Sequence, residues 1–124
     1  MRILCGYFRH DHFAQARRTR LPMARIGSNL GWCEVPDDRN YNRPVRMPYA
    51  ASHETMRRAD ALYDVCIVLD WNIRPRRRGR GSAIFFHLAR PGFPPTEGCV
   101  AVSRAVMLRL LPHLGPDTIL TVRR

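Results

Sequence analysis

Two short apolar segments constrain the fold more than any other feature of the sequence. Residues 63–69 (YDVCIVL) and 82–88 (SAIFFHL) are rich in β-branched and aromatic side chains, which favour buried strands. The apolar character of the second segment is continuous rather than alternating, so both of its faces must be covered by other parts of the chain. The sequence therefore predicts a sheet whose central strands are buried.

The remaining elements interrupt these strands rather than alternate with them. Ser52 is expected to cap a short helix that carries Met56, Ala59 and Leu62 and ends before Tyr63. Ser103 is expected to cap a second helix, whose apolar face is Val106, Met107, Leu110 and Leu111 and which stops at Gly115-Pro116. Residues 118–122 close the chain as a strand, and residues 34–48 and 72–81 are predicted loops. We expect a mainly β or α+β fold rather than a doubly wound one.

Size and charge narrow the class of protein. The chain has 124 residues, enough for one domain with one core, and a formal net charge of +11. All 21 basic residues are arginine, which suggests a compositional bias more than a selected phosphate-binding surface. Five arginines lie within residues 74–80, where we expect a solvated loop, with an anion-docking patch as the alternative. A basic module that binds nucleic acid or another polyanion is thus one candidate function.

No apolar run approaches the roughly 20 residues that span a bilayer. No signal peptide is visible after Met1-Arg2.

The segment 81–103 contains the side chains that most clearly indicate a catalytic site. A predicted buried strand delivers His87 at its end, a proline-rich turn follows, and Gly98-Cys99 opens the next element. A thiol is a weak nucleophile at neutral pH, and an adjacent imidazole can take its proton. The turn is long enough for the chain to reverse and to bring the two side chains together. Gly98 leaves room for a substrate carbonyl and for two backbone amides that face a developing oxyanion.

Other candidate residues carry less specific signals. The four cysteines lack the CxxC spacing of zinc and redox sites, and we expect Cys66 to fill the core, while Cys33 lines a cleft or is structural. His10 and His12 could share one face of a strand as metal ligands, although no second pair of ligands accompanies them. His53 and Glu54 are expected in the first turn of a helix.

The order of these motifs resembles a known family. The strand ending in histidine, the turn, Thr-x-Gly-Cys, the capped helix and the closing strand resemble the catalytic half of the YkuD-type L,D-transpeptidase domain. Upstream segments resemble one bacterial branch of that family in order and spacing: residues 31–34 (GWCE), 38–45 (DRNYNRPV), 63–65 (YDV) and 69–72 (LDWN). The resemblance covers nearly everything from Leu21 to Val122, and implies a YkuD-like β-sandwich with short helices.

The resemblance implies an activity and roles for particular residues. Cys99 would be the nucleophile, His87 the general base, the carbonyl of Leu88 the group that orients the imidazole, and Thr96 the family's Ser/Thr, beside Gly98. The family attacks the carbonyl of diaminopimelate in a peptidoglycan stem tetrapeptide, releases D-alanine and passes the acyl group to an amine, with carboxypeptidase activity as a side reaction. No metal or organic cofactor is implied. Four residues are expected to contact substrate: Trp32, Tyr41, Asn42 and Glu97. The alternatives are a core position for Trp32 and a role in holding the loop for Tyr41 and Asn42.

The sequence also departs from the family pattern. Glu97 stands where many members have histidine, and Ala101 stands where a polar residue is usual. Family domains begin with further strands and a Gly-Asp-Gly…Pro-x-Gly stretch that does not precede Arg2, so a shortened, inactive domain is a further alternative. We assign residues 21–124 to the L,D-transpeptidase-like catalytic domain and leave residues 1–20 as a poorly determined N-terminal segment. The resemblance implies a location in the cell envelope or periplasm, and because no signal peptide is visible, the cytoplasm is the alternative. The acyl acceptor and the oligomeric state stay open.

Overall fold

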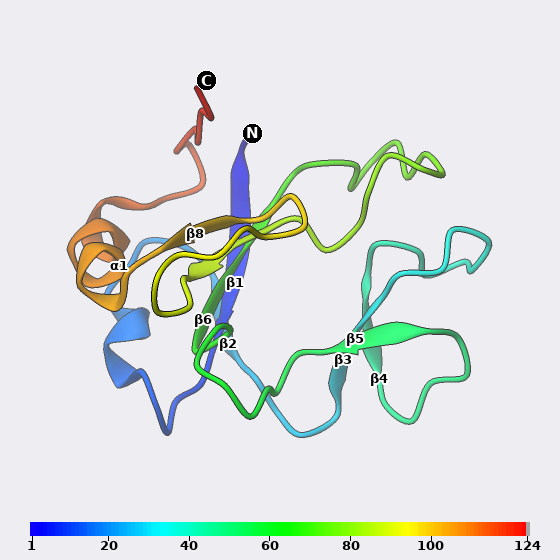
Figure 1. The fold of residues 1–124 in the computed structure, drawn as a ribbon, viewed down its shortest axis with the longest axis horizontal. Helices are drawn as coiled ribbons and strands as arrows, with labels where there is room; N and C mark the ends of the chain where they lie inside the picture. The colour runs from blue at the N-terminus through cyan, green and yellow to red at the C-terminus, as the bar shows by residue number, and fades with distance from the viewer. Residues whose placement is uncertain (124) are drawn as a thin grey trace.

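A computed structural model describes residues 1–123, in which two β-sheets and a small group of helices form three layers. The elements in chain order are β1 (Ile3–Phe8), η1 (Ala14–Arg17), β2 (Met23–Arg25), β3 (Leu30–Cys33), β4 (Pro44–Arg46), β5 (His53–Thr55), β6 (Val65–Leu69), β7 (Phe85–Leu88), β8 (Val100–Val102), α1 (Arg104–Leu110) and η2 (Leu111–His113). Figure 1 shows α1 on one side of the larger sheet and the strands β3, β4 and β5 on the other.

The larger sheet has the strand order β2-β1-β6-β7-β8. β6 and β7 lie inside it and are antiparallel, whereas β7 and β8 are parallel. Every residue of β6 and of β7 is buried, as the two apolar segments of the sequence predict. The second strand begins at Phe85 rather than at Ser82, because Ala83 has a positive φ of 53° that ends regular pairing.

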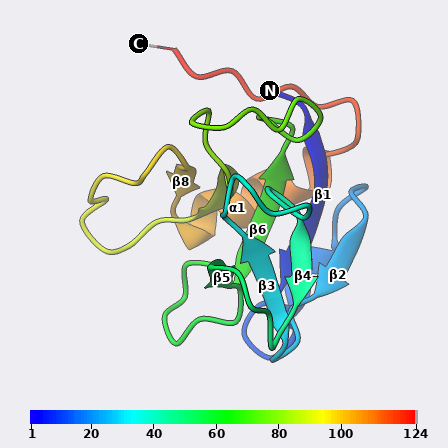
Figure 2. The ribbon, with the colours of Figure 1, turned by 90° about the vertical axis from the view of Figure 1, so that its right-hand side faces the viewer.

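The smaller sheet, β4-β3-β5, is antiparallel and covers one face of β6 and β7. A cluster of aromatic rings joins the two sheets. Trp32 of β3 meets Phe85 of β7 edge-to-face with 5.0 Å between ring centroids, and Tyr63 meets the same ring at 5.7 Å. Figure 2, turned by 90°, shows β3, β4 and β5 in front of the larger sheet. This arrangement confirms the mainly β sandwich with short helices.

The opposite face of the larger sheet is covered by the helical segments. Met107 of α1 and Leu111 of η2 are buried with Ile67 and Leu88 in one apolar cluster. Ser103 caps α1 as predicted, because its Oγ accepts a hydrogen bond from the amide of Val106 at 3.2 Å. Val106 itself is 41% exposed, so the expected apolar face of this helix is narrower than the sequence suggests.

Two predicted elements are wrong. Residues 52–62 form no helix: residues 53–55 form β5, whose pairing with β3 satisfies backbone groups that a helix would have satisfied internally. Ser52 caps nothing, since its Oγ donates to Glu34 Oε1 at 2.6 Å. The closing strand at 118–122 is reduced to one bridge between Arg2 and Ile119.

Residues 1–20, to which the sequence assigns no element, contain β1 and η1. β1 lies between β2 and β6 in the larger sheet, and its residues Ile3 and Phe8 are 1% exposed. The predicted loop at 34–48 contains β4, whereas residues 72–81 have no regular element.

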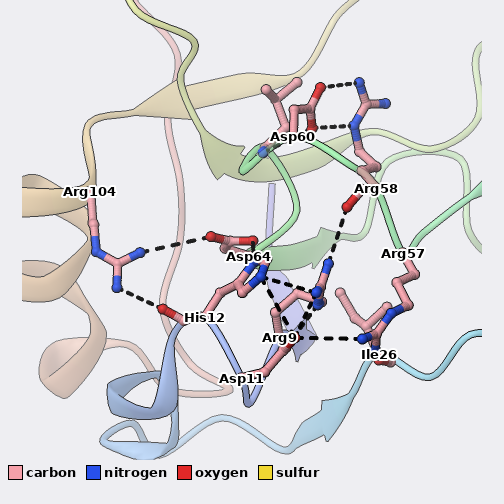
Figure 3. A network of polar contacts seen from close by, with 10 residues as sticks. Arg9, Asp11, His12, Ile26, Arg57, Arg58, Asp60, Asp64 and Arg104 are labelled. Atoms are coloured by element: carbon pink, nitrogen blue, oxygen red, sulfur yellow. Dashed lines mark hydrogen bonds and ion pairs between the residues drawn. The ribbon is translucent and has the colours of Figure 1, made fainter.

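A polar network ties the turn after β1 to the loop before β6 (Figure 3). His12 Nδ1 lies 2.9 Å from Oδ1 of Asp64, and Arg104 NH1 lies 3.8 Å from its Oδ2. Arg9 donates to the carbonyl of Arg58 at 3.1 Å and to Asp11 through two nitrogens. The His10-Asp11-His12 segment therefore takes part in ion pairs. Within residues 1–123, no group of three or more His, Cys, Asp and Glu side chains is arranged to hold a metal ion, and no helix has the length and apolar character to cross a bilayer.

Substituting Asp64 tests this network. Its carboxylate is 5% exposed and contacts the His12 imidazole and the Arg104 guanidinium, which are themselves about half exposed, so Asp64→Ala should lower the free energy of unfolding by about 2 kcal/mol, below the cost of breaking a fully buried ion pair. The control Asp117→Ala removes a carboxylate that is 80% exposed and 3.7 Å from Arg20, and should change stability by less than about 0.5 kcal/mol. Urea denaturation followed by circular dichroism measures both, and equal losses would contradict the structural role of Asp64.

Candidate active site

The pairing of β7 with β8 brings His87 and Cys99 to one face of the sheet. His87 stands opposite Ala101 in the parallel register, and Cys99 precedes Ala101 by two positions. Because residues two apart along an extended chain share a face, Cys99 lies on the same face of the sheet as Ala101 and His87. Both side chains line the same cavity of about 320 Å³. The structure thus brings together the two residues that the sequence singles out.

His87 is held in one orientation by its neighbour. Its Nδ1 lies 2.7 Å from the carbonyl oxygen of Leu88, which can only accept a hydrogen bond, so Nδ1 carries the proton and Nε2 is left as an acceptor. The ring is 3% exposed and meets Tyr63 edge-to-face at 5.4 Å. Burial lowers the pKa of His87, and the charges of Arg58 and Arg90 lower it further, whereas the hydrogen bond to Leu88 and the charge of Asp60 oppose this. A neutral imidazole with a free Nε2 is ready to take a proton.

Cys99 is anchored by the segment that precedes β7. Its Sγ donates to the carbonyl of Ala83 at 3.3 Å and accepts from the amide of Phe85 at 3.5 Å. Burial raises the pKa of this thiol, the hydrogen bond from Phe85 opposes that rise, and the charges of Glu54 and Glu97 add to it. Within residues 1–123 the thiol makes no hydrogen bond to His87, so the S–H must turn away from Ala83 before its proton can pass to Nε2.

The turn that carries Cys99 is shaped by Thr96 and Gly98. Thr96 Oγ1 donates to the carbonyl of Cys99 at 2.5 Å. Gly98 has a φ of +91°, which a larger residue would adopt only with strain, and a Cβ there would lie 3.3 Å from Ile84. The amides of Gly98 and Cys99 make no hydrogen bond to another backbone group in the part of the chain that is described. Two adjacent donors are thus free beside the thiol.

Three residues expected to contact substrate lie elsewhere. Trp32 and Asn42 are 3% and 1% exposed and lie in the interior, where Trp32 Nε1 donates to Asn42 Oδ1 at 2.9 Å. The same oxygen accepts from the amide of Ala83 at 3.1 Å, so Asn42 holds the backbone segment that anchors Cys99. Tyr41 is buried and borders a separate surface depression beside Pro75 and Arg76. Their burial agrees with the alternatives of a core position and of a role in holding the loop, because a polar side chain in a turn can satisfy buried backbone groups as well as it can bind a ligand. Glu97 alone of the four lines the cavity.

The cavity has charged walls that sequence analysis missed. Glu54 enters it from β5 and accepts a short hydrogen bond from the hydroxyl of Tyr63. Burial raises the pKa of Glu54, although the hydrogen bond from Tyr63 and the charge of Arg58 oppose this. Arg58 donates two hydrogen bonds of 2.7 Å to Asp60. Its guanidinium lies over the Tyr63 ring, 5.2 Å from the centroid. Arg90 also lines the cavity and is more exposed than Arg58. Assigning Glu54 to a helix concealed that its side chain faces the cavity from a strand.

The other cysteines lie outside this cavity and are free thiols. Cys66 is fully buried between the sheets, as expected for a core residue. Cys33 is also fully buried, which favours the structural role over the cleft.

Comparison with known proteins agrees with this geometry. The family model of the L,D-transpeptidase catalytic domain, YkuD, matches residues 5–122. The chain belongs to the YkuD family. No curated protein and no solved structure matches the chain significantly. The match to the YkuD domain begins within β1 and includes both sheets, α1 and the cavity with Cys99 and His87. A YkuD domain indicates an enzyme of the L,D-transpeptidase type with a role connected to peptidoglycan, in a family typically associated with the cell envelope.

The pH dependence of thiol alkylation tests the electrostatics of Cys99. Because burial raises its pKa, the thiolate fraction at pH 7–8 should be below that of glutathione, and the rate with iodoacetamide should still be rising above pH 9. Peptide mass mapping separates Cys99 from the partly exposed Cys5. A rate that reaches its plateau below pH 8 would instead indicate a preformed thiolate–imidazolium pair.

Proposed function

We propose that this YkuD domain catalyses acyl transfer on peptidoglycan stem peptides, with Cys99 as the nucleophile and His87 as the general base. One observation carries the proposal: the thiol and an imidazole whose Nε2 is free to accept a proton share a face of the sheet and one cavity. The expected substrate is the stem tetrapeptide with diaminopimelate at its third position. Crosslinking or remodelling of the cell wall, and thereby cell shape, would be the outcome, which places the site of action in the cell envelope.

The geometry supports a two-step reaction. His87 Nε2 takes the proton of Cys99, and Sγ attacks the carbonyl carbon of diaminopimelate. The carbonyl oxygen becomes an oxyanion, which the free amides of Gly98 and Cys99 would stabilise. The C–N bond to D-alanine then breaks, and the leaving amine takes the proton from His87, which gives a thioester.

The second step reverses the roles. An acceptor amine attacks the thioester carbonyl, a C–N bond forms, and the C–S bond breaks. The proton lost by the amine passes through His87 back to the sulfur, so the enzyme returns to its starting state. Water in place of the amine gives hydrolysis, the carboxypeptidase side reaction. Neutral starting forms of both groups fit general-base catalysis rather than a resting ion pair.

Thr96 and Glu97 take supporting roles. Thr96 fixes the carbonyl of Cys99 and thereby the turn in which both amides lie. Glu97 is exposed at the rim and is available to the substrate. Trp32 and Asn42 act as positioning residues below the site rather than as substrate contacts.

Intact-protein mass spectrometry after exposure to a carbapenem tests the proposal, because this acylating agent should leave a stable adduct on Cys99. Wild type should gain the mass of the inhibitor, Cys99→Ala should gain none, and His87→Gln should react roughly 10²–10⁴ times more slowly, since the general base is lost. Cys5→Ala is the matched control and should react like wild type. An unshifted mass in well-folded wild-type protein would contradict the proposal and would favour an inactive domain or a binding module.

Binding of a polyanion through residues 74–80 is the alternative function. In that loop, Arg78 pairs with Asp37 at 2.5 Å and Arg76 donates to the carbonyl of Arg39 at 2.9 Å, so two of the five arginines are engaged within the protein. Such binding should weaken steeply with salt and be unaffected by Cys99→Ala, whereas acyl transfer should tolerate charge changes at 76–78.

A further inference from the structure

The cavity around Cys99 is lined by charges of both signs. The carboxylates of Glu54 and Glu97 and the guanidiniums of Arg58 and Arg90 line it together with Cys99 and His87. A ligand that carries a cation and an anion a few bonds apart can pair with both kinds of charge, whereas a ligand with a single charge pairs with one.

Of the two carboxylates, Glu54 is better placed to bind a cationic group of a ligand. It lies on a strand, its side chain is 25% exposed, and the hydroxyl of Tyr63 holds one of its oxygens. Its nearest cation is Arg58, 3.9 Å away, and that guanidinium is already engaged by the two oxygens of Asp60. The Glu54 carboxylate thus loses part of its hydration without gaining a close ion pair, and a ligand ammonium would supply one.

Arg90 is the corresponding cation in the cavity lining. It is 55% exposed, and its nearest carboxylate, Asp60, is 4.0 Å away and already bound to Arg58. A guanidinium has five N–H donors, so Arg90 keeps donors for a ligand carboxylate in a two-bond fork.

We infer that Glu54 and Arg90 form a subsite for a zwitterionic amino acid group on the side chain of the acyl donor, with the ammonium at Glu54 and the carboxylate at Arg90. The inference rests on the proposed function, because it assigns the group next to the carbonyl that Cys99 attacks. In the expected donor, the far end of diaminopimelate carries such a group, one amine and one carboxylate on the same carbon.

Donor discrimination tests this assignment. The rate of D-alanine release, as kcat/KM, is measured with three stem tetrapeptides: the intact donor, a donor whose free side-chain amine is acetylated, and a donor whose free side-chain carboxylate is amidated. Wild type should prefer the intact donor over each of the others by roughly tenfold or more, the size of a lost charge-assisted hydrogen bond. In Glu54→Gln the preference over the acetylated donor should fall to about one, and in Arg90→Gln the preference over the amidated donor should do so.

Matched controls separate binding from structure. Glu34→Gln and Arg46→Gln remove exposed charges from the same small sheet region outside the cavity, and should keep both preferences. A purely structural role of Glu54 would lower the rate with all three donors alike and leave the ratios at their wild-type values, which overturns the inference. Collapse of the acetylated-donor ratio in Glu97→Gln but not in Glu54→Gln would overturn it equally.

The carbapenem adduct distinguishes failure of the subsite from failure of the proposed acyl transfer. If wild type forms the adduct but shows no preference among the donors, the proposed acyl transfer stands and the subsite fails. If wild type forms neither adduct nor D-alanine, the proposed function fails and the subsite falls with it.

Discussion

The side-chain amide of Asn42 is the interaction on which the site depends. Its Oδ1 accepts from Trp32 in the small sheet and from the amide of Ala83 before β7, while its Nδ2 donates to the carbonyl of Asn72 at 2.9 Å. One buried amide thus joins the small sheet to the chain that leaves β6 and the chain that enters β7. Since Asn42 is 1% exposed, each unmade hydrogen bond would leave a buried polar group unsatisfied. The thiol of Cys99 is hydrogen-bonded to the carbonyl of Ala83, so the position of the thiol depends on this network.

The surroundings of the thiol and of the imidazole favour the neutral form of both groups. Burial raises the pKa of Cys99 and lowers that of His87, so each group is more readily neutral than it would be in water. A neutral pair has no charge to desolvate before substrate arrives, and in the proposed reaction the proton would move as the sulfur attacks the substrate carbonyl. The hydrogen bond from His87 to Leu88 then matters because it fixes which ring nitrogen is available.

The sequence predicts the parts of the fold in which local signals agree with tertiary structure. The continuous apolar segments give β6 and β7, and Ser103 gives the start of α1, because burial and capping are local to those residues. Residues 52–62 show the opposite case, in which the edge of β3 supplies hydrogen bonds that a local helix pattern cannot reveal. The motif around His87 and Cys99 likewise lies in one segment and is visible, whereas Glu54 and Arg58 reach the cavity from a distant part of the chain. The roles of Trp32 and Asn42 could not be read either, since a buried amide and a substrate-binding amide have the same sequence signal.

The high arginine content serves structure in several places, which limits what net charge says about function. Arg104 lies over the ring of Phe13, 4.1 Å from its centroid, and also donates to the carbonyl of His12 at 2.9 Å. Arg9 is 7% exposed and Arg58 is bound to Asp60 while it lies over the ring of Tyr63. A guanidinium suits these sites because it stacks on aromatic rings and donates to several acceptors at once. Arginines used in this way still add to the long-range field, but they do not form a continuous docking surface. The charged groups that line the cavity, rather than the total of +11, are therefore the electrostatic feature that bears on the chemistry.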